Sequence, residues 1–115
     1  MPRNMSFALT TEQVRRREKT VTRRLGWWFL NPGDILTAVE KARGLRKGEK
    51  IRPICRIRIV STRKEPLSAI TQDDVGREGF GTASRKWFIE MFCQTHGCRS
   101  NDEVNRIEFE YIGPQ

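Results

Sequence analysis

The chain has 115 residues, of which 37% are hydrophobic and 31% charged, and its formal net charge is +8. This length and composition predict one folded domain spanning residues 1–115, and they exclude a disordered chain or a two-domain protein. Residues 1–64 hold 17 Lys/Arg against 5 Asp/Glu, whereas residues 65–115 hold 5 against 9. We therefore expect the first half to build a basic surface that suits a polyanionic partner.

Three cysteines at irregular positions, without a signal-peptide pattern, argue against a disulfide framework and predict a cytoplasmic protein. Cys93, His96 and Cys98 invite a zinc interpretation with Cys55 as fourth ligand, but their spacing matches no standard paired-cysteine motif. We therefore expect buried free thiols, no metal and no cofactor. No apolar run approaches the roughly 20 residues that cross a bilayer, so we expect no membrane association.

The chain begins with a short strand, predicted from the alternation of Met5, Phe7 and Leu9 with small residues. A short helix should follow, because Thr10 or Thr11 can cap its first turn.

The basic stretch at residues 15–28 holds six Lys/Arg side chains and two adjacent tryptophans. The helix should not run far past Lys19, because residues 20–22 are β-branched at every position and prefer an extended backbone. Residues three apart point to opposite sides of a strand, but they converge when the first ends a helical turn. We therefore expect Lys19 and Thr22 to share one pocket.

Gly26 and the turn at residues 31–34 predict a bent loop that carries Trp27 and Trp28. Each indole could stack on a base or cover a barrel end, and their adjacency allows one to do each. Residues 35–39 predict the next strand.

The segment at residues 42–50 is predicted to be a basic, solvated loop, and the strand after it should end at Pro66. One face of that strand is apolar and the other carries arginines for solvent or ligand; the apolar residues are Cys55, Ile57 and Ile59, and the arginines are Arg56 and Arg58.

Two helices and a last strand are predicted for the second half. Residues 71–74 begin a short helix with an acidic first turn, which residues 78–81 close. The next helix should start at Thr82 or Ser84 and end at His96. Its wide apolar face comprises Trp87, Phe88, Met91 and Phe92.

The last predicted strand covers residues 104–112, with Ile107, Phe109 and Tyr111 inward and Glu108 and Glu110 outward. Strands and helices do not alternate regularly along the chain. This order predicts an α+β fold with a small curved mixed sheet or barrel.

Five short motifs carry a resemblance that spans nearly the whole chain. They are KTVTRR at 19–24, PGD at 32–34, EGF at 78–80, WF at 87–88 and IEF at 107–109. In this order they resemble the ASCH family of the PUA-like superfamily, in particular its small stand-alone bacterial and phage members. The resemblance implies a PUA-like β-barrel with helices covering its openings and a basic cleft for RNA or a nucleobase.

Some small members of the family are amidohydrolases that remove the acyl group from N-acylated cytidine, and others are nucleases or RNA binders. By resemblance, the catalytic lysine, threonine and glutamate of the amidohydrolases fall on Lys19, Thr22 and Glu78. A lysine acts as a base only where burial or nearby cations lower its pKa. It could then take the proton of Thr22, with Glu78 orienting the lysine or moving a proton.

The basic surface of the first half favours a polynucleotide over a free nucleoside, because many cations can contact many phosphates. We therefore expect RNA, or single-stranded or modified nucleic acid, to bind in the cleft. The residues expected to contact it are Arg17, Lys19, Arg23, Arg24, Trp27, Trp28, Arg56 and Arg58. The alternatives are a hydrolase of amidohydrolase or ribonuclease type that uses the same cleft, and a non-enzymatic protein that binds an acidic partner.

Overall fold

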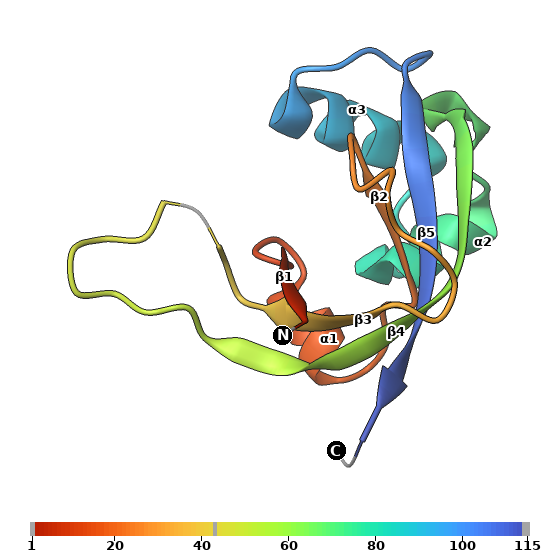
Figure 1. Ribbon diagram of the computed structural model, residues 1–115. Helices are drawn as coiled ribbons and strands as arrows, with labels where there is room; N and C mark the ends of the chain where they lie inside the picture. The colour runs from red at the N-terminus through yellow and green to blue at the C-terminus, as the bar shows by residue number, and fades with distance from the viewer. Residues whose placement is uncertain (1, 43, 114–115) are drawn as a thin grey trace.

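The fold is organised by a five-stranded mixed sheet with the strand order β1-β3-β4-β5-β2. The computed structural model describes residues 2–42 and 44–113. The first strand pairs in parallel with the third, and the other pairs are antiparallel. Their bounds are β1 (Arg3–Ser6), β2 (Val21–Arg24), β3 (Ile35–Val39), β4 (Pro53–Pro66) and β5 (Glu103–Ile112). Figure 1 shows the two long strands, β4 and β5, running side by side through the molecule.

The sheet curls until its two edge strands, β1 and β2, approach each other. Arg24 at the end of β2 donates a hydrogen bond from Nη2 to the carbonyl oxygen of Ser6 at the end of β1, at 2.7 Å. A register shift between Ile59 and Ser61 interrupts the β4–β5 ladder, and such bulges increase bending and twist. The result is a curled half-barrel, so the predicted α+β fold with a small curved mixed sheet is confirmed.

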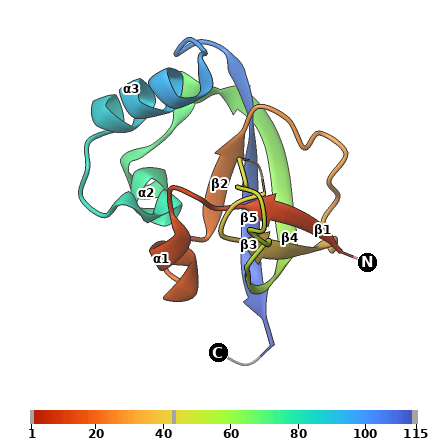
Figure 2. The same cartoon turned by 90° about the vertical axis from the view of Figure 1, so that its left-hand side faces the viewer.

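Two clusters of buried apolar side chains divide the core. The first fills the inside of the curled sheet and includes Met5, Phe7, Leu36, Ile57, Ile59, Ile107 and Phe109. The second lies against α3 (Arg85–His96) and comprises Leu67, Ile70, Val75, Phe88, Phe92 and Val104. Figure 1 shows α2 (Gln72–Val75) and α3 beside the upper part of β4 and β5. After a quarter turn, these helices and α1 (Thr11–Arg15) lie on one side of the strands (Figure 2).

The ends of α2 and α3 follow local capping chemistry that the sequence predicts, whereas Thr10 at the start of α1 makes no side-chain cap hydrogen bond. The side chain of Thr71 accepts a hydrogen bond from Asp74 N at 3.1 Å, and that of Ser84 accepts one from Trp87 N at 3.0 Å. Gly97 ends α3 in the left-handed conformation, with φ 67°. Of the two residues predicted to start α3, the structure uses Ser84.

Two apolar residues predicted to face inward are exposed. Leu9 is 62% exposed because the chain turns after Phe7 to enter α1, so the alternation of the strand no longer applies there. Trp87 is 45% exposed, while Phe88 and Phe92 are buried. The face of α3 that contacts the core is therefore narrower than the predicted one, and Trp87 packs beside it against Phe80, with ring centroids 5.3 Å apart.

The beginning of β5 differs from the predicted alternation, since residues 104–107 are buried on both faces. The inner side of Ile107 contacts the core, whereas Arg106 on the opposite side bonds to Asp74 of α2. These residues are buried on both faces because α2 covers the outer face of β5 there. Within the described ranges, no helix is long and apolar enough to cross a membrane.

We predict that Phe88→Ala lowers the free energy of unfolding by about 3–5 kcal/mol, because it opens a cavity in the second cluster. Trp87→Ala, the neighbouring aromatic on the same helix, should lower it by about 1 kcal/mol or less. Urea denaturation followed by circular dichroism compares the two variants. Equal losses would contradict the assignment of the buried face of α3.

Candidate functional site

A cavity of about 380 Å³ lies where α3 faces the meeting point of β1 and β2. One part of its lining is aromatic and apolar, with Phe7, Phe80, Phe88, Met91 and Phe92. The other part is polar and charged, with Lys19, Thr22, Arg23, Arg24 and Glu78. The structure therefore brings the predicted trio of Lys19, Thr22 and Glu78 to one cavity, together with two of the predicted arginines.

Lys19 and Glu78 form a buried ion pair at the cavity. Lys19 Nζ donates to Glu78 Oε1 and to the Glu78 carbonyl oxygen, both at 2.7 Å. Burial lowers the pKa of Lys19, and the charge of Glu78 opposes this shift. Among the described residues no hydrogen bond joins Lys19 to Thr22. The ammonium of Lys19 is therefore directed at Glu78.

The backbone around Lys19 explains how a surface-type residue becomes buried. The helix α1 ends at Arg15, and Arg17 takes a left-handed φ of 58°. The carbonyl oxygen of Gln13 then accepts hydrogen bonds from the N–H groups of Glu18 and Lys19, at 2.9 and 3.4 Å. This reversal turns Lys19 into the cavity just before β2 begins.

Glu78 is presented by η2 (Gly76–Phe80), a π-helical turn that continues α2. Gly79 has a φ of 99°, and a Cβ there would lie 2.9 Å from Gln13 Cγ, so only glycine fits. Gln13 Nε2 donates to the Gly79 carbonyl at 3.0 Å. The turn is also tied to Thr20, whose N–H donates to the Arg77 carbonyl at 2.9 Å. These contacts fix Glu78 against Lys19.

Arg24 is the cation of the cavity that has no carboxylate partner among the described residues. Its Nε donates to Thr22 Oγ1 at 3.1 Å and its Nη2 to the Ser6 carbonyl, while its guanidinium lies 4.9 Å from the ring centroid of Phe7. All three partners are neutral. Burial lowers the pKa of Arg24 to about 10, and the charge of Glu78 opposes the shift. Arg24 thus remains a cation at neutral pH.

Arg23 was predicted to contact nucleic acid, but its side chain is fully buried among carboxylates. Its Nη2 contacts Glu65 at 2.9 Å and Asp74 at 2.6 Å, and its Nη1 contacts Glu78 at 3.3 Å. The guanidinium is therefore engaged within the protein. It supports Glu78 from the side opposite Lys19.

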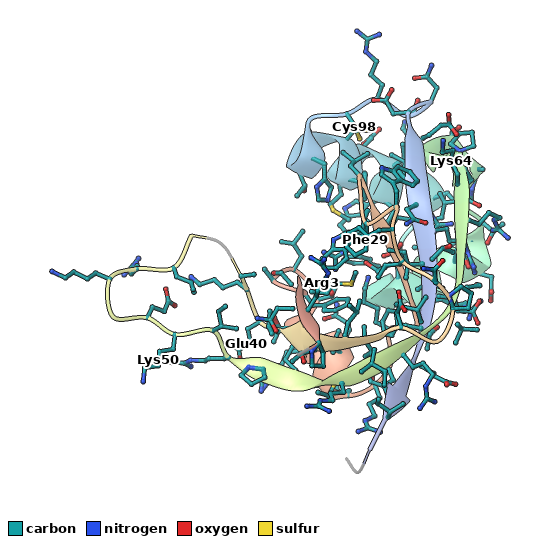
Figure 3. All side chains as sticks on the ribbon, viewed as in Figure 1. Arg3, Phe29, Glu40, Lys50, Lys64 and Cys98 are labelled. Carbon is teal, nitrogen blue, oxygen red and sulfur yellow. The ribbon has the colours of Figure 1, made fainter. Side chains whose placement is uncertain are left out.

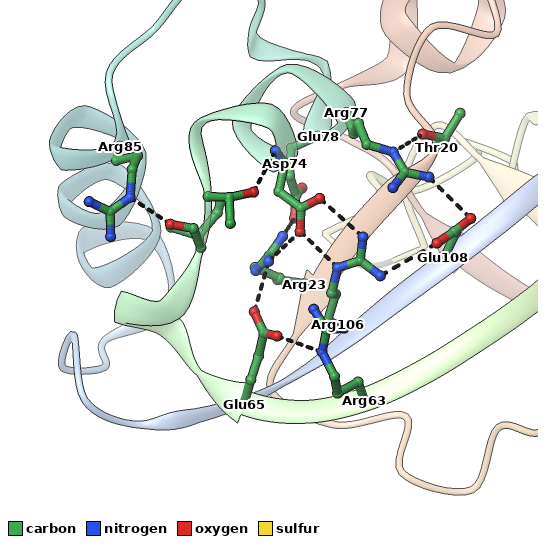
Figure 4. A network of polar contacts seen from close by, with 12 residues as sticks. Thr20, Arg23, Arg63, Glu65, Asp74, Arg77, Glu78, Arg85, Arg106 and Glu108 are labelled. Atoms are coloured by element: carbon green, nitrogen blue, oxygen red, sulfur yellow. Dashed lines mark hydrogen bonds and ion pairs between the residues drawn. The ribbon is translucent and has the colours of Figure 1, made fainter.

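These contacts continue into a network of ion pairs behind the cavity (Figure 4). Arg106 binds Asp74 through two hydrogen bonds, at 2.7 and 3.0 Å, and Glu108 at 3.5 Å. Arg77 in turn contacts Glu108 at 3.1 Å. Burial alone would raise the pKa of Asp74, but the hydrogen bonds from Arg106 and Arg23 hold this pKa well below its usual range.

Three predicted arginines do not line the cavity. Arg17 donates to the Gly113 carbonyl at 3.3 Å and lies over the ring of Tyr111. Arg56 and Arg58 are exposed on β4, and Arg58 pairs with Glu110 at 2.9 Å. Periodicity placed these two side chains on the exposed face correctly. It could not show that this face lies away from the cavity.

The two tryptophans have different environments. Trp27 packs against the first core cluster, and its carbonyl oxygen accepts a hydrogen bond from Asn105 Nδ2 at 3.0 Å. Trp28 is 51% exposed. Of the two roles considered for each residue, Trp27 covers the core, whereas the indole of Trp28 is available to a partner.

The cysteines and the histidine do not form a metal site within the part of the chain that the structure describes. Cys93 and Cys98 are half-buried free thiols whose Sγ atoms lie 4.0 Å apart. Cys55 is also half-buried. His96 lines the cavity and packs against Phe92, with ring centroids 4.2 Å apart.

Sequence reasoning missed Asp74, Arg106 and Glu65, which hold the charged part of the site together. Asp74 was predicted only as an acidic residue in a helix's first turn. The available signal was Arg106, a charged residue beside apolar positions of a core strand, since a buried arginine requires a carboxylate partner. Nothing in the spacing indicated which carboxylate that is.

The comparisons with known proteins concern the fold. No family model matches the sequence, and no curated protein matches it. The structure is similar to that of an ASCH domain from Lactobacillus crispatus JV V101, with a TM-score of 0.67 and 21% identity, over 94% of this chain and 77% of that chain. It is also similar to a protein of the DUF984 family from Enterococcus faecalis V583, with a TM-score of 0.66 and 13% identity, over 97% of this chain and 77% of that one.

These likenesses, at TM-scores of 0.66 and 0.67, show that the chain has the fold of an ASCH-like domain. The predicted PUA-like fold is confirmed, since ASCH domains have that fold. Because fold and activity are separable, the site has to be argued from its own geometry.

We predict that Asp74→Asn lowers the free energy of unfolding by about 3–5 kcal/mol at pH 7, since it leaves two buried guanidinium groups short of a negative charge. Asp73→Asn, the exposed neighbour on the same helix, should have little effect. The pKa of Asp74 is lower in the folded state than its unfolded value of about 3.9, so its stabilisation is present above pH ~4 and is lost as the pH falls.

The difference between the two variants should therefore shrink in urea denaturation at pH 3. A difference that is the same at pH 3 and pH 7 would contradict a charge-dependent role of Asp74.

Proposed function

We propose that this domain binds RNA, or another single-stranded or modified nucleic acid, by taking one nucleobase into the cavity. The observation that carries the proposal is Arg24, a partly buried guanidinium whose partners among the described residues are all neutral, at the edge of an aromatic-lined cavity. A partly buried cation is further stabilised by an anionic ligand group, which the described residues do not supply to Arg24.

The size and lining of the cavity support a single base. At about 380 Å³, it lies near the lower end of the range of small-molecule sites, roughly 300–1,000 Å³. The partly exposed ring of Phe80 offers a face on which any base can stack. Beside it, Lys19 and Arg24 supply donors and Glu78 supplies carboxylate oxygens. Arginine and lysine pair with base carbonyls and ring nitrogens, and carboxylates accept from exocyclic amines.

The net charge of +8 supports a polymer as the natural form of this ligand. A free nucleoside would need only the cavity. Exposed cations beyond it, such as those of the basic first half, add affinity only when a ligand brings several phosphates.

We predict that Arg24→Met lowers the affinity for a mixed-sequence RNA octamer roughly tenfold or more, because hydrogen bonds to a charged group contribute about 1.5–3 kcal/mol. Arg99→Ala, which removes an exposed arginine from a loop, should change the affinity much less. Fluorescence anisotropy at two salt concentrations measures both. Equal losses for the two variants would mean that binding depends on general charge, and absence of wild-type binding to RNA and single-stranded DNA would refute the proposal.

A second candidate is hydrolysis of an N-acylated cytidine-type nucleoside, as the resemblance implies. It is favoured by the lowered pKa of Lys19, which makes a neutral amine more accessible. In this reaction the amine turns from Glu78 to take the proton of Thr22, and Thr22 Oγ1 attacks the acyl carbonyl. The hydrogen bond from Arg24 Nε stabilises the developing negative charge on Oγ1. The bond between the acyl carbon and the base nitrogen then breaks, and Lys19 returns the proton to the departing amine. Water hydrolyses the resulting ester on Thr22 and releases the acid.

For this candidate we expect acid release from an acylated cytidine, with Lys19→Ala and Thr22→Val each lowering kcat by at least a hundredfold. Chromatography of the nucleoside product measures the reaction, and circular dichroism checks the fold of each variant. Release that persists in Thr22→Val would contradict threonine as the nucleophile. No turnover across a panel of acylated nucleosides would leave binding as the function of the cavity.

A further inference from the structure

The loop between β2 and β3 exposes two large aromatic side chains. Trp28 is 51% exposed and Phe29 is 54% exposed. Each has a cation over its ring: Lys64 Nζ lies 5.4 Å from the Trp28 ring centroid, and Arg3 Cζ lies 4.8 Å from that of Phe29. Figure 3 shows Arg3 and Phe29 next to each other and Lys64 higher on β4. We call these four residues the aromatic platform.

The loop backbone is held in place, so the exposure of these rings is a fixed feature of the surface. Asn105 Nδ2 bonds to the carbonyl oxygens of Gly26 and Trp27, at 3.3 and 3.0 Å. Farther along, Gly33 N donates to the Ile59 carbonyl at 2.8 Å. At the first of these anchors, the side chain of Trp27 packs against the first core cluster. A large apolar surface that is exposed yet rigid suits a binding site, because little conformational entropy is lost on binding.

Residues of the platform are close in sequence to residues that line the cavity. Arg3 begins β1, and Ser6, which lines the cavity and binds Arg24, ends it. The two are three residue steps apart along the strand, which is roughly 10 Å. Stacked nucleotides rise about 3.4 Å each, so this distance corresponds to about three nucleotides. Leu25, the first residue of the loop, directly follows Arg24.

We propose that the aromatic platform binds the nucleotides that flank the base held in the cavity, so that the protein grips a short single-stranded segment at two places. This rests on the proposed binding of nucleic acid. The indole of Trp28 and the ring of Phe29 offer stacking faces, and Lys64 and Arg3 offer cations to the adjacent phosphates. The combination fits single-stranded nucleic acid, which presents bases and phosphates in alternation. Stacking and phosphate contacts of this kind accept any base, whereas the cavity holds a single base of the strand.

The test compares a double variant, Trp28→Ala with Phe29→Ala, against Trp87→Ala, which removes a tryptophan of similar exposure on α3. The probes are mixed-sequence RNA pools of two and eight nucleotides, measured by fluorescence anisotropy with the full chain. We expect the double variant to lose at least tenfold in affinity for the octamer. The dinucleotide is too short to reach the platform from the cavity, so its affinity should stay at the wild-type value. Trp87→Ala should match the wild type with both probes.

The outcomes separate the platform from the cavity. If the wild type binds the octamer and Arg24→Met weakens this binding, an unchanged affinity in the double variant would overturn the platform and leave the proposed function standing. If the wild type binds neither RNA nor single-stranded DNA, both proposals fail together. Binding of a poly-glutamate peptide that depends on Trp28, without RNA binding, would assign the platform to an acidic protein and overturn the proposal. Melting curves that match those of the wild type ensure that the double variant is folded.

Discussion

The burial of five charged side chains behind and beside the cavity is the constraint on which the site depends. Lys19, Glu78, Arg23, Asp74 and Arg106 follow one another with alternating sign, and each contacts the next within 3.3 Å. A buried charge without a partner is strongly unfavourable, so each member requires its neighbours. The chain of contacts joins α2 and its π-helical turn to β2 and β5. Displacement of any of these elements would leave a charge unpaired.

This pairing also explains which cation is left for a ligand. Glu78 is shared between Lys19 and Arg23, and Asp74 between Arg23 and Arg106. No carboxylate among the described residues pairs with Arg24, which is held by neutral oxygens and by the ring of Phe7. The hydrogen bond to the Ser6 carbonyl also joins the edge strands of the half-barrel. Arg24 therefore closes the sheet and brings a positive charge to the cavity, which couples the fold to the proposed recognition of a ligand.

The strands, the caps of α2 and α3 and the pocket shared by Lys19 and Thr22 could be predicted from the sequence, because each depends on residues close together in the chain. The β-branched run at residues 20–22 predicted the extended segment after Lys19, although α1 already ends at Arg15. Alternation located β4 and β5. Alternation could not reveal that Arg56 and Arg58 face away from the cavity. Nor could it reveal that Arg23 forms ion pairs with three carboxylates. Those properties depend on the direction in which the sheet curls and on which helix covers which face.

By itself, then, the sequence determined the class of fold, the caps of α2 and α3 and the change to extended backbone after Lys19, since backbone preferences and capping act over a few residues. Tertiary structure alone decided which of the many cationic side chains stay available to a ligand. Ion pairs between residues such as Arg23 and Asp74, 51 positions apart, form only when the sheet curls and α2 docks on it. Tertiary packing likewise placed Trp27 against the core and left Trp28 exposed, because only one of two adjacent indoles can point toward the core.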